Sequence, residues 1–305
     1  MKAVVTGGAG FIGSHLVEEL VNRGIEVHII DNLVSGKHHN IHPLAIFYPY
    51  DICSPEAKKA IMDIHPDCVF HLAAQADVSK SIKEPLYDAQ VNISGTINIL
   101  EACRDASVQK IIFASTSAVY GNFQAEIVST EDPAQPISYY GLSKLSAENY
   151  IRVFSQLYGL NYSILRYGNV YGPRQQPKGE GGVIAVFLQK LKENVPLSIH
   201  GDGEQSRDFI YVKDVVSANI AAMKNGHQET LHVSTGKSTS INNLVRVLED
   251  LHPESIKARY TSARFGDIKH SCLENSHTCN LLKWDPQYDI LEGLKETYVF
   301  VSDQS

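Results

Sequence analysis

The stretch TGGAGFIG, from Thr6 to Gly13, follows a short apolar run and precedes a helical pattern. Its glycines Gly7, Gly10 and Gly13 have the spacing G-x-x-G-x-x-G, a variant of the dinucleotide-binding fingerprint. Glycine at these positions permits a tight turn and a close approach of the backbone to a pyrophosphate, and the helix that follows supplies N–H donors at its N-terminus. The stretch therefore predicts a dinucleotide-binding turn between a buried strand and a helix.

An acidic residue lies at the distance that such a turn requires. Asp31 is 18 residues after Gly13, at the end of the second apolar run, where a carboxylate can bind the hydroxyls of the adenosine ribose. A carboxylate there repels the 2′-phosphate of NADP, so we predict NAD as the cofactor. Lys37 and His38 lie nearby, but a solvated loop is the simpler explanation for both. A purely structural turn with a surface Asp31 is the weaker alternative.

Apolar runs and helical patterns alternate through the first half of the chain. We predict strands at 3–6, 27–30, 45–48, 68–72, 111–115 and 162–166, and helices at 11–22, 55–64, 85–105 and 139–158. Strand alternating with helix is typical of the α/β class, with a doubly wound parallel sheet of the Rossmann type covered by helices on both faces.

The pattern changes after residue 168. A loop rich in Gly, Pro and charge occupies 171–182, and helices are predicted at 183–193, 212–224, 241–251 and 290–301. We expect a dinucleotide-binding Rossmann domain over 1–168, to which segments near 208–232 return, and a smaller, mixed α/β lobe over 169–305. The cleft between the two is the expected place for a ligand.

Composition and charge narrow the class of protein. The 305 residues are 43% hydrophobic and 20% charged, and the net charge of −7 argues against nucleic acid as a partner. We expect no signal peptide, because the opening MKAVVTGGAGF lacks a basic region before a long apolar one. No apolar run approaches the roughly 18 residues of a membrane-spanning helix. The five cysteines lack CxxC spacing and the 13 histidines lack a metal-binding pattern, which favours a cytoplasmic protein with reduced thiols and no metal.

Two side chains on the helix predicted at 139–158 can act together. Tyr140 and Lys144 are four residues apart and so share one helix face, whereas Tyr139 lies about 100° away. A phenol, with a pKa near 10, is a poor base at neutral pH. A neighbouring ammonium and the positive nicotinamide of NAD would stabilise the phenolate. Such a pair is more often a surface feature, but after a dinucleotide-binding turn we favour a catalytic role.

Three consecutive hydroxyl residues lie at the carboxyl end of the strand predicted at 111–115. Ser115, Thr116 and Ser117 follow one another within FASTSAVYG. The carboxyl end of a central parallel strand faces the ligand crevice, which favours a functional role for these hydroxyls. A turn whose hydroxyls cap the local backbone is the alternative.

Six motifs together resemble a known family. In order they are TGGAGFIGSH, ASTSAVYG, YYGLSK, RYGNVYGPR, GDGEQSRDFIYVKD and ARFGDIKHS. They are similar to motifs of the extended short-chain dehydrogenase/reductases that act on nucleotide sugars, and most of all to those of the UDP-hexose 4-epimerase type. The resemblance covers essentially the whole chain. It implies an NAD that stays tightly bound and is regenerated in each turnover.

The resemblance also implies roles for individual residues. Thr116 would hydrogen-bond the sugar O4, Tyr140 would take its proton, and Lys144 would hold the nicotinamide ribose and lower the pKa of the phenol. The expected cofactor-binding residues are Gly7, Gly10, Phe11, Ile12, Gly13, Asp31, Asn32, Asp51, Ile52, Leu72, Ala73, Ala74, Asn92, Tyr140, Lys144 and Tyr167.

The lobe over 169–305 would bind the nucleotide sugar. Arg207 and Arg264 match arginines that clamp the pyrophosphate, a role that suits the bidentate guanidinium. Asn169 matches a contact to the uridine diphosphate, and Asp267 a ligand of the uridine ribose. The expected substrate-binding residues are Ser117, Asn169, Val183, Arg207, Arg264, Asp267 and Ser271.

The residues after Thr116 separate the chemistries of the family. Nucleotide-sugar 4,6-dehydratases have Asp-Glu there, and UDP-glucuronate decarboxylases have a Glu two residues after the Thr. Here the positions hold Ser117 and Ala118, so neither chemistry has its carboxyl group. Oxidation at C4, rotation of the 4-keto sugar and re-reduction remain. A reductase or dehydrogenase that releases NADH, a UDP-glucuronate 4-epimerase and a non-catalytic NAD-sensing protein stay open as alternatives.

Two further expectations concern the substrate and the assembly. Ser271, seven residues after Arg264, is small at a position that limits the sugar's 2-substituent in the family, so UDP-GlcNAc and UDP-GalNAc are expected alongside UDP-glucose and UDP-galactose. The helices at 85–105 and 139–158 pair between subunits in the family, and the second is apolar on more than one face. A homodimer is therefore expected.

Overall fold

The computed structural model describes residues 1–122, 126–177, 182–262 and 269–303. Within them, seven strands form a central sheet in which every neighbouring pair is parallel. In the order of the sheet the strands are β11 (Glu229–Val233), β6 (Asn161–Tyr167), β5 (Lys110–Thr116), β4 (Cys68–His71), β1 (Lys2–Thr6), β2 (Glu26–Ile30) and β3 (Ile46–Tyr48).

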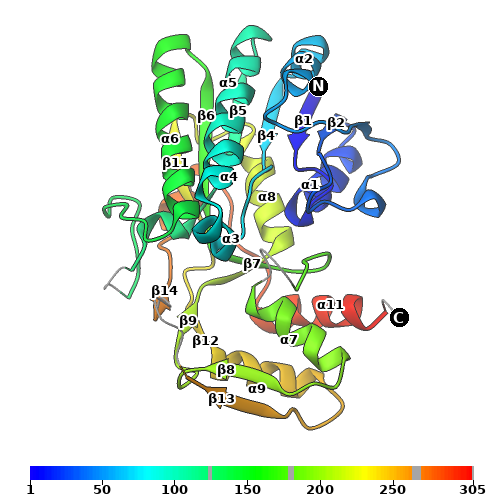
Figure 1. Ribbon diagram of the computed structural model, residues 1–305, viewed down its shortest axis with the longest axis vertical. Helices are drawn as coiled ribbons and strands as arrows, with labels where there is room; N and C mark the ends of the chain where they lie inside the picture. Colours follow the sequence, from blue (N-terminus) through cyan, green and yellow to red (C-terminus); the bar gives the residue numbers. More distant parts are fainter. Residues whose placement is uncertain (123–125, 178–181, 263–268, 304–305) are drawn as a thin grey trace.

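Helices cover both faces of this sheet (Figure 1). On one face pack α1 (Phe11–Asn22) and α8 (Val212–Ala222), and on the other α2 (Pro55–Ile64), α5 (Gly95–Asp105) and α6 (Tyr139–Tyr158). Alternate residues of β1 enter the two cores, since Ala3 and Val5 pack on the side of α1 and Val4 on the side of α2. The predicted doubly wound α/β fold is confirmed.

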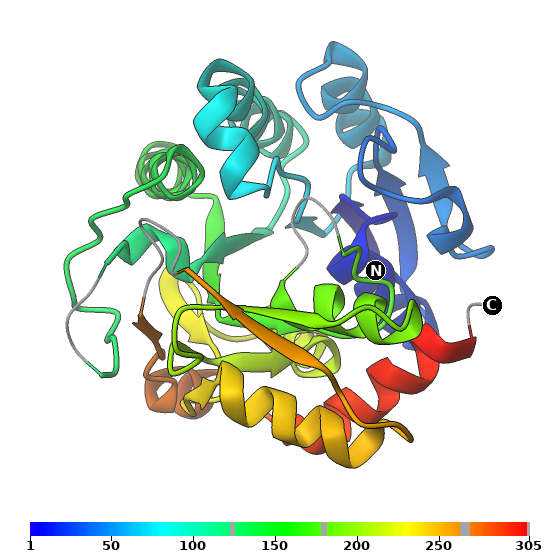
Figure 2. The ribbon, with the colours of Figure 1, turned by 60° about the horizontal axis from the view of Figure 1, so that its bottom comes forward.

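A smaller lobe lies below the sheet in Figure 1. Its described residues form three small sheets, β7 with β10, β8 with β13, and β12-β9-β14. In Figure 2, where this lobe comes forward, β8 and β13 lie side by side near α9. Its elements are β7 (Asn169–Tyr171), α7 (Val183–Lys192), β8 (Leu197–His200), β9 (Ser206–Arg207), β10 (Phe209–Tyr211), β12 (Thr239–Ser240), α9 (Ile241–Leu251), β13 (Ala258–Thr261), β14 (His270–Ser271) and α11 (Ile290–Asp303). The helix α10 (Ser276–Leu282) returns to the sheet and packs against β11 and α8.

The chain crosses between the two parts more than once. The chain passes through the smaller lobe from β7 to β10. It then returns to the sheet, where α8 packs against α1 and β11 pairs with β6. The sheet is therefore completed by a segment far along the chain. The predicted domain limits of 1–168 and 169–305 stay a prediction.

Local signals account for the helix that carries the Tyr–Lys pair. Ser138 caps the N-terminus of α6, because its side chain accepts a hydrogen bond from Gly141 N over 3.1 Å. Gly159 ends the helix in the left-handed conformation, with φ of 71°. The predicted range of 139–158 for this helix matches the structure.

The helix predicted at 85–105 is interrupted. It consists of α4 (Pro85–Ala89), a π-helical segment η2 (Gln90–Ser94) and α5. The Asn92 side chain points inward within this wider turn and is 2% exposed. Before it lies α3 (Val78–Lys83), which was not predicted and which Asp77 caps by accepting from Lys80 N over 3.0 Å. The described part of the chain also contains two 3-10 turns, η1 (His38–Asn40) and η3 (Ser117–Tyr120).

None of the helices within the described ranges is long and apolar enough to cross a membrane. The same residues contain no group of three or more His, Cys, Asp or Glu side chains that could hold a metal ion.

Candidate active site

A cleft of about 790 Å³ lies where the carboxyl edge of the sheet meets the smaller lobe. Its walls come from the glycine loop, the ends of the sheet strands, α6, and the strands β7, β9 and β14. The residues predicted for the site that line it are Gly7, Gly10, Phe11, Ile12, Gly13, Asp31, Asn32, Asp51, Ile52, Leu72, Ala73, Ala74, Thr116, Ser117, Tyr140, Lys144, Tyr167, Asn169, Val183, Arg207 and Ser271.

Among the predicted residues that the structure describes, Asn92 does not line the cleft. Asn92 lies behind the wall and holds Gln75, accepting from its backbone N over 2.8 Å and donating to its carbonyl oxygen over 2.9 Å. A direct contact of Asn92 with a cofactor stays a prediction. Arg264 and Asp267 lie outside the described residues.

The glycine loop forms a cradle that a side chain would fill. Gly7 has a φ of 72°, and a Cβ on it would lie 2.7 Å from the backbone N of Ala73. A Cβ on Gly13 would overlap the carbonyl oxygen of Gly7. Gly10 caps α1 and has no side chain to occupy the first N–H groups of the helix. The backbone can therefore approach a pyrophosphate closely, so these residues fit a dinucleotide.

Asp31 ends the second strand of this cradle. It is 7% exposed, and its oxygens accept from Ala9 N over 3.0 Å and from Leu33 N over 2.8 Å. Burial raises the pKa of this carboxyl group, and the two backbone bonds oppose that effect. The bonds fix the carboxylate at the rim of the cleft, where its remaining lone pairs suit ribose hydroxyls.

Lys144 is buried beside the cleft, with 3% of its surface exposed. Its Nζ donates to the carbonyl oxygen of Ala114 over 2.8 Å and lies 4.5 Å from the centre of the Phe113 ring. Desolvation lowers the pKa of Lys144 to about 8, and the charges of Asp88 and Glu148 oppose that shift. The amine is thus held inside the protein and away from bulk solvent.

Tyr140 begins the same face of α6, one turn before Lys144, and also lines the cleft. Tyr139, by contrast, is 49% exposed and is not among the lining residues. The structure therefore brings the predicted phenol and ammonium to one wall of one cleft.

Thr116 is the last residue of β5. Its Oγ1 accepts from Ala118 N over 3.1 Å, which caps the turn η3, and the residue also lines the cleft. Thr116 thus fits both explanations given for these hydroxyls, because it caps the turn and also lines the cleft. Ser115 differs, since its Oγ donates to Glu148 Oε1 over 2.6 Å.

The smaller lobe supplies the opposite wall. Arg207 on β9 and Ser271 on β14 are partners in a parallel ladder, so the two residues lie side by side. Asn169 begins β7, where its N–H donates to the Asp208 carbonyl oxygen over 2.7 Å. Val183 begins α7.

Sequence reasoning missed several lining residues. Gln75 follows β4, while Lys80 lies on the unpredicted helix α3 with its Nζ 4.2 Å from the centre of the Tyr87 ring. Asp88 on α4 does not line the cleft but is 1% exposed and accepts from Gln75 Nε2 over 2.8 Å. No sequence pattern identifies Asp88, because its burial depends on contacts such as that with Gln75, 13 residues earlier in the chain.

The chain is similar to known proteins over most of its length. The model of the NAD dependent epimerase/dehydratase family matches residues 3–234. A protein of Methanocaldococcus jannaschii named as a putative UDP-glucose 4-epimerase is 43% identical over 293 residues, covering 96% of this chain and 95% of its own.

Two solved structures are similar over their whole length. The UDP-glucose 4-epimerase of Thermus thermophilus, in complex with NAD, has a TM-score of 0.95 and 36% identity, with 100% of both chains covered. The UDP-N-acetylglucosamine 4-epimerase of Methanobrevibacter ruminantium, in complex with UDP-N-acetylmuramic acid, has a TM-score of 0.95 and 39% identity, covering 100% of this chain and 99% of its own.

Proposed function

The chain belongs to the NAD dependent epimerase/dehydratase family, and we propose that it interconverts UDP-hexoses that differ in configuration at C4. It is an isomerase of the nucleotide-sugar 4-epimerase type that uses NAD. The proposed substrates are the UDP-GlcNAc/UDP-GalNAc and UDP-glucose/UDP-galactose pairs. The observation that carries the proposal is the meeting of Thr116, Tyr140 and Lys144 at one cleft with the glycine cradle.

The chain's own groups would manage the proton at O4. The Tyr140 phenolate takes the proton of the O4 hydroxyl, Thr116 Oγ1 hydrogen-bonds O4, and the Lys144 ammonium stabilises the phenolate. Held by the glycine loop and Asp31, NAD would supply reversible hydride chemistry at C4, by which a hydride removed from one face of the sugar is returned to the other. Tyr140 then returns its proton to O4, so that the protein and NAD end as they began.

The residues that follow Thr116 support epimerisation over elimination. Ser117 and Ala118 line the cleft directly after Thr116. Neither side chain can act as a carboxylic acid or as a carboxylate base, which removal of water from the sugar or decarboxylation would need. The 4-keto sugar is therefore left to be reduced again.

The wall beside Arg207 supports a broad substrate range. Ser271 lies next to Arg207 and presents a small side chain to the cleft. If the pyrophosphate binds at Arg207, a serine at the neighbouring position leaves room for a 2-acetamido group on the sugar.

The test is proton NMR of the purified protein with UDP-glucose, UDP-GlcNAc and UDP-glucuronate in separate tubes and no added cofactor. We expect the C4 epimer of the first two to form at the expense of the substrate. A requirement for added NADH, or its net release, would identify a reductase or dehydrogenase. Conversion of UDP-glucuronate alone would identify the glucuronate enzyme, and no conversion by NAD-loaded protein would support an NAD-sensing role.

We also propose a homodimer, with α6 at its interface. Apolar side chains on one face of α6 are exposed, and Leu86 on α4 and Ile82 on α3 continue the patch with 72% and 59% exposure. A contiguous apolar surface of this kind is typical of an interface between protein molecules. The exposed apolar residues on this face of α6 are Tyr139, Leu142, Tyr150, Val153 and Leu157.

A further inference from the structure

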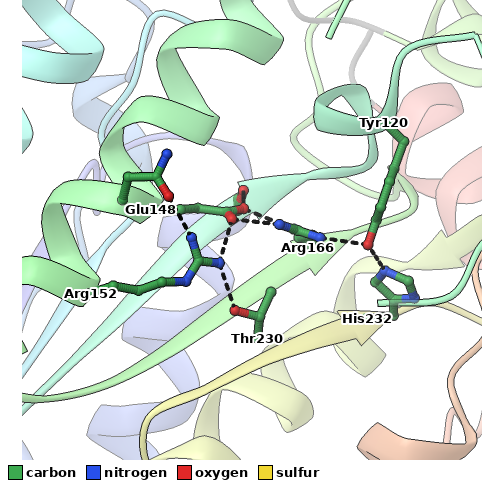
Figure 3. A network of polar contacts seen from close by, with 8 residues as sticks. Tyr120, Glu148, Arg152, Arg166, Thr230 and His232 are labelled. Carbon is green, nitrogen blue, oxygen red and sulfur yellow. Dashed lines mark hydrogen bonds and ion pairs between the residues drawn. The ribbon is translucent and has the colours of Figure 1, made fainter. Parts of the chain in front are cut away.

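A buried ion pair links α6 to the neighbouring strand β6. Glu148, one turn after Lys144 on α6, is 0% exposed, and Arg166 on β6 is 4% exposed. Arg166 Nη2 donates to Glu148 Oε2 over 2.6 Å, and Arg166 Nε donates to Oε1 over 2.9 Å. Figure 3 shows this two-pronged contact, with Arg152 reaching Oε2 over 2.9 Å from the outer side.

The pair also holds the segment that contains Thr116. On one side, Ser115 Oγ donates to Glu148 Oε1 over 2.6 Å, and Ser115 immediately precedes Thr116. On the other side, Arg166 Nη1 donates to Tyr120 OH over 2.6 Å (Figure 3). The end of β5 and the turn η3 are thus fixed both before and after Thr116.

The far end of the network is anchored in turn. Tyr120 OH lies 2.6 Å from His232 Nε2 on β11, and His232 Nδ1 lies 2.8 Å from the carbonyl oxygen of Glu274. A neutral imidazole can form both hydrogen bonds, because it accepts from the phenol at one nitrogen and donates to the carbonyl oxygen from the other. Burial lowers the pKa of His232 to about 4, in agreement with that neutral form.

Stability alone is a weak reason for such a pair. Apolar residues of similar volume in place of a buried ion pair commonly leave a protein equally stable. Apolar residues could not reproduce the directed hydrogen bonds of the pair, which run from the carboxylate to α6 and two strands and from Arg166 to the turn η3. Proton transfer is sensitive to displacements of about 1 Å between reacting groups.

We propose that Glu148 is a positioning residue for the epimerase reaction, which through Arg166 and Ser115 sets Thr116 relative to Tyr140 and Lys144. The inference rests on the proposed function. Glu148 does not line the cleft, so its removal is expected to slow the chemical step without weakening substrate binding.

The experiment compares three variants with the wild type. Glu148→Gln keeps the shape of the side chain and removes its charge. This change leaves Arg166 buried without a counter-charge, which could itself destabilise the protein. The double variant Glu148→Leu with Arg166→Met is therefore included, because it removes both charges. Glu101→Gln is the control, since Glu101 on α5 also forms an ion pair, with Lys58 over 2.9 Å, and does not line the cleft.

The readouts are the thermal unfolding temperature, the NAD content, kcat and KM, and the isotope effect with substrate deuterated at C4. We expect both Glu148 variants to show kcat about 10- to 100-fold lower, KM within threefold of wild type, unchanged NAD content, and a larger isotope effect on kcat. The control is expected to match the wild type in all of these.

Three results would overturn the inference. A folded, NAD-loaded Glu148 variant with kcat within threefold of wild type would show that the pair does not position the reacting groups. A double variant that does not fold would assign the pair to stability instead. Wild-type protein that epimerises no UDP-sugar would overturn the proposed function and the inference together, which the first two results would not do.

Discussion

Lys144 Nζ donates a hydrogen bond to the carbonyl oxygen of Ala114 over 2.8 Å, two residues before Thr116 in the chain. An ammonium has three donors, so this bond ties the lysine of α6 to the end of β5 and still leaves donors for a ligand in the cleft. The bond therefore ties the helix that carries Tyr140 and Lys144 to the strand end that carries Thr116.

Tyr140→Phe tests the proposed base. Without the phenol, no group takes the O4 proton, and we expect turnover to fall by about 10²- to 10⁴-fold while NAD stays bound. The measurements are the epimerisation rate by NMR and the NAD released on denaturation. Tyr139→Phe, at the exposed neighbouring position, is the control. Near wild-type turnover by the Tyr140 variant would exclude this residue as the base.

Asp88→Asn tests the electrostatic control of Lys144. Asp88 is 1% exposed, and its Oδ2 has no hydrogen-bond partner within the described part of the chain. Its negative charge opposes the desolvation that lowers the pKa of Lys144 to about 8, as does Glu148, while His71 is a further titratable group near the lysine. Asparagine keeps the shape and removes the charge, so the pKa of Lys144 should fall further.

The ammonium would then be lost at a lower pH, and the phenolate of Tyr140 would lose its cation. We therefore expect the alkaline fall of kcat/KM to begin at a lower pH in Asp88→Asn than in the wild type. The check is a pH–rate profile at constant ionic strength, with the exposed Asp63→Asn as the control. Superimposable profiles would show that Asp88 does not act on Lys144.

Ser271→Tyr tests the proposed substrate range. A phenol ring in place of the serine would fill the space beside Arg207, so we expect turnover of UDP-GlcNAc to fall by 10-fold or more while UDP-glucose is still converted. Ser271→Ala keeps the position small and should retain both activities. The proposed role of Ser271 is wrong if UDP-GlcNAc turnover survives in the tyrosine variant while UDP-glucose turnover falls.

Leu157→Glu tests the proposed dimer. Leu157 is 67% exposed on α6, and a carboxylate buried there without a partner would weaken the association. Light scattering at micromolar concentration should give twice the chain mass of 33.7 kDa for the wild type and a single chain mass for the variant. Val299→Glu changes an exposed residue of α11 and is the control. A monomeric wild type would rule the dimer out.

The sequence predicted most of the sheet and the helices beside it, because their signals are local. The strands are continuous apolar runs, and α2 begins with the capping residue Ser54 followed by Pro55. The same holds for α6, between Ser138 and Gly159. The glycine loop and Asp31 were predicted for the cleft by their spacing, and the structure has them line it.

Features that depend on distant partners were not predictable in the same way. The π-helical turn at Asn92 is held by bonds to Gln75, 17 residues earlier in the chain. Each of β9, β12 and β14 is two residues long and exists only through pairing with strands far along the chain. Glu148 falls on a helix whose pattern gives no sign that Arg166, 18 residues later, lies opposite.

The position of β11 beside β6 has a consequence for how the protein is made. Until residues 229–233 have left the ribosome, the outer edge of β6 has no neighbour, although the other strands of the sheet have already been synthesised. An open edge of this kind can pair with a strand of another nascent chain. Recombinant yield should therefore depend on chaperone supply late in translation, and fragments that end before β11 should aggregate.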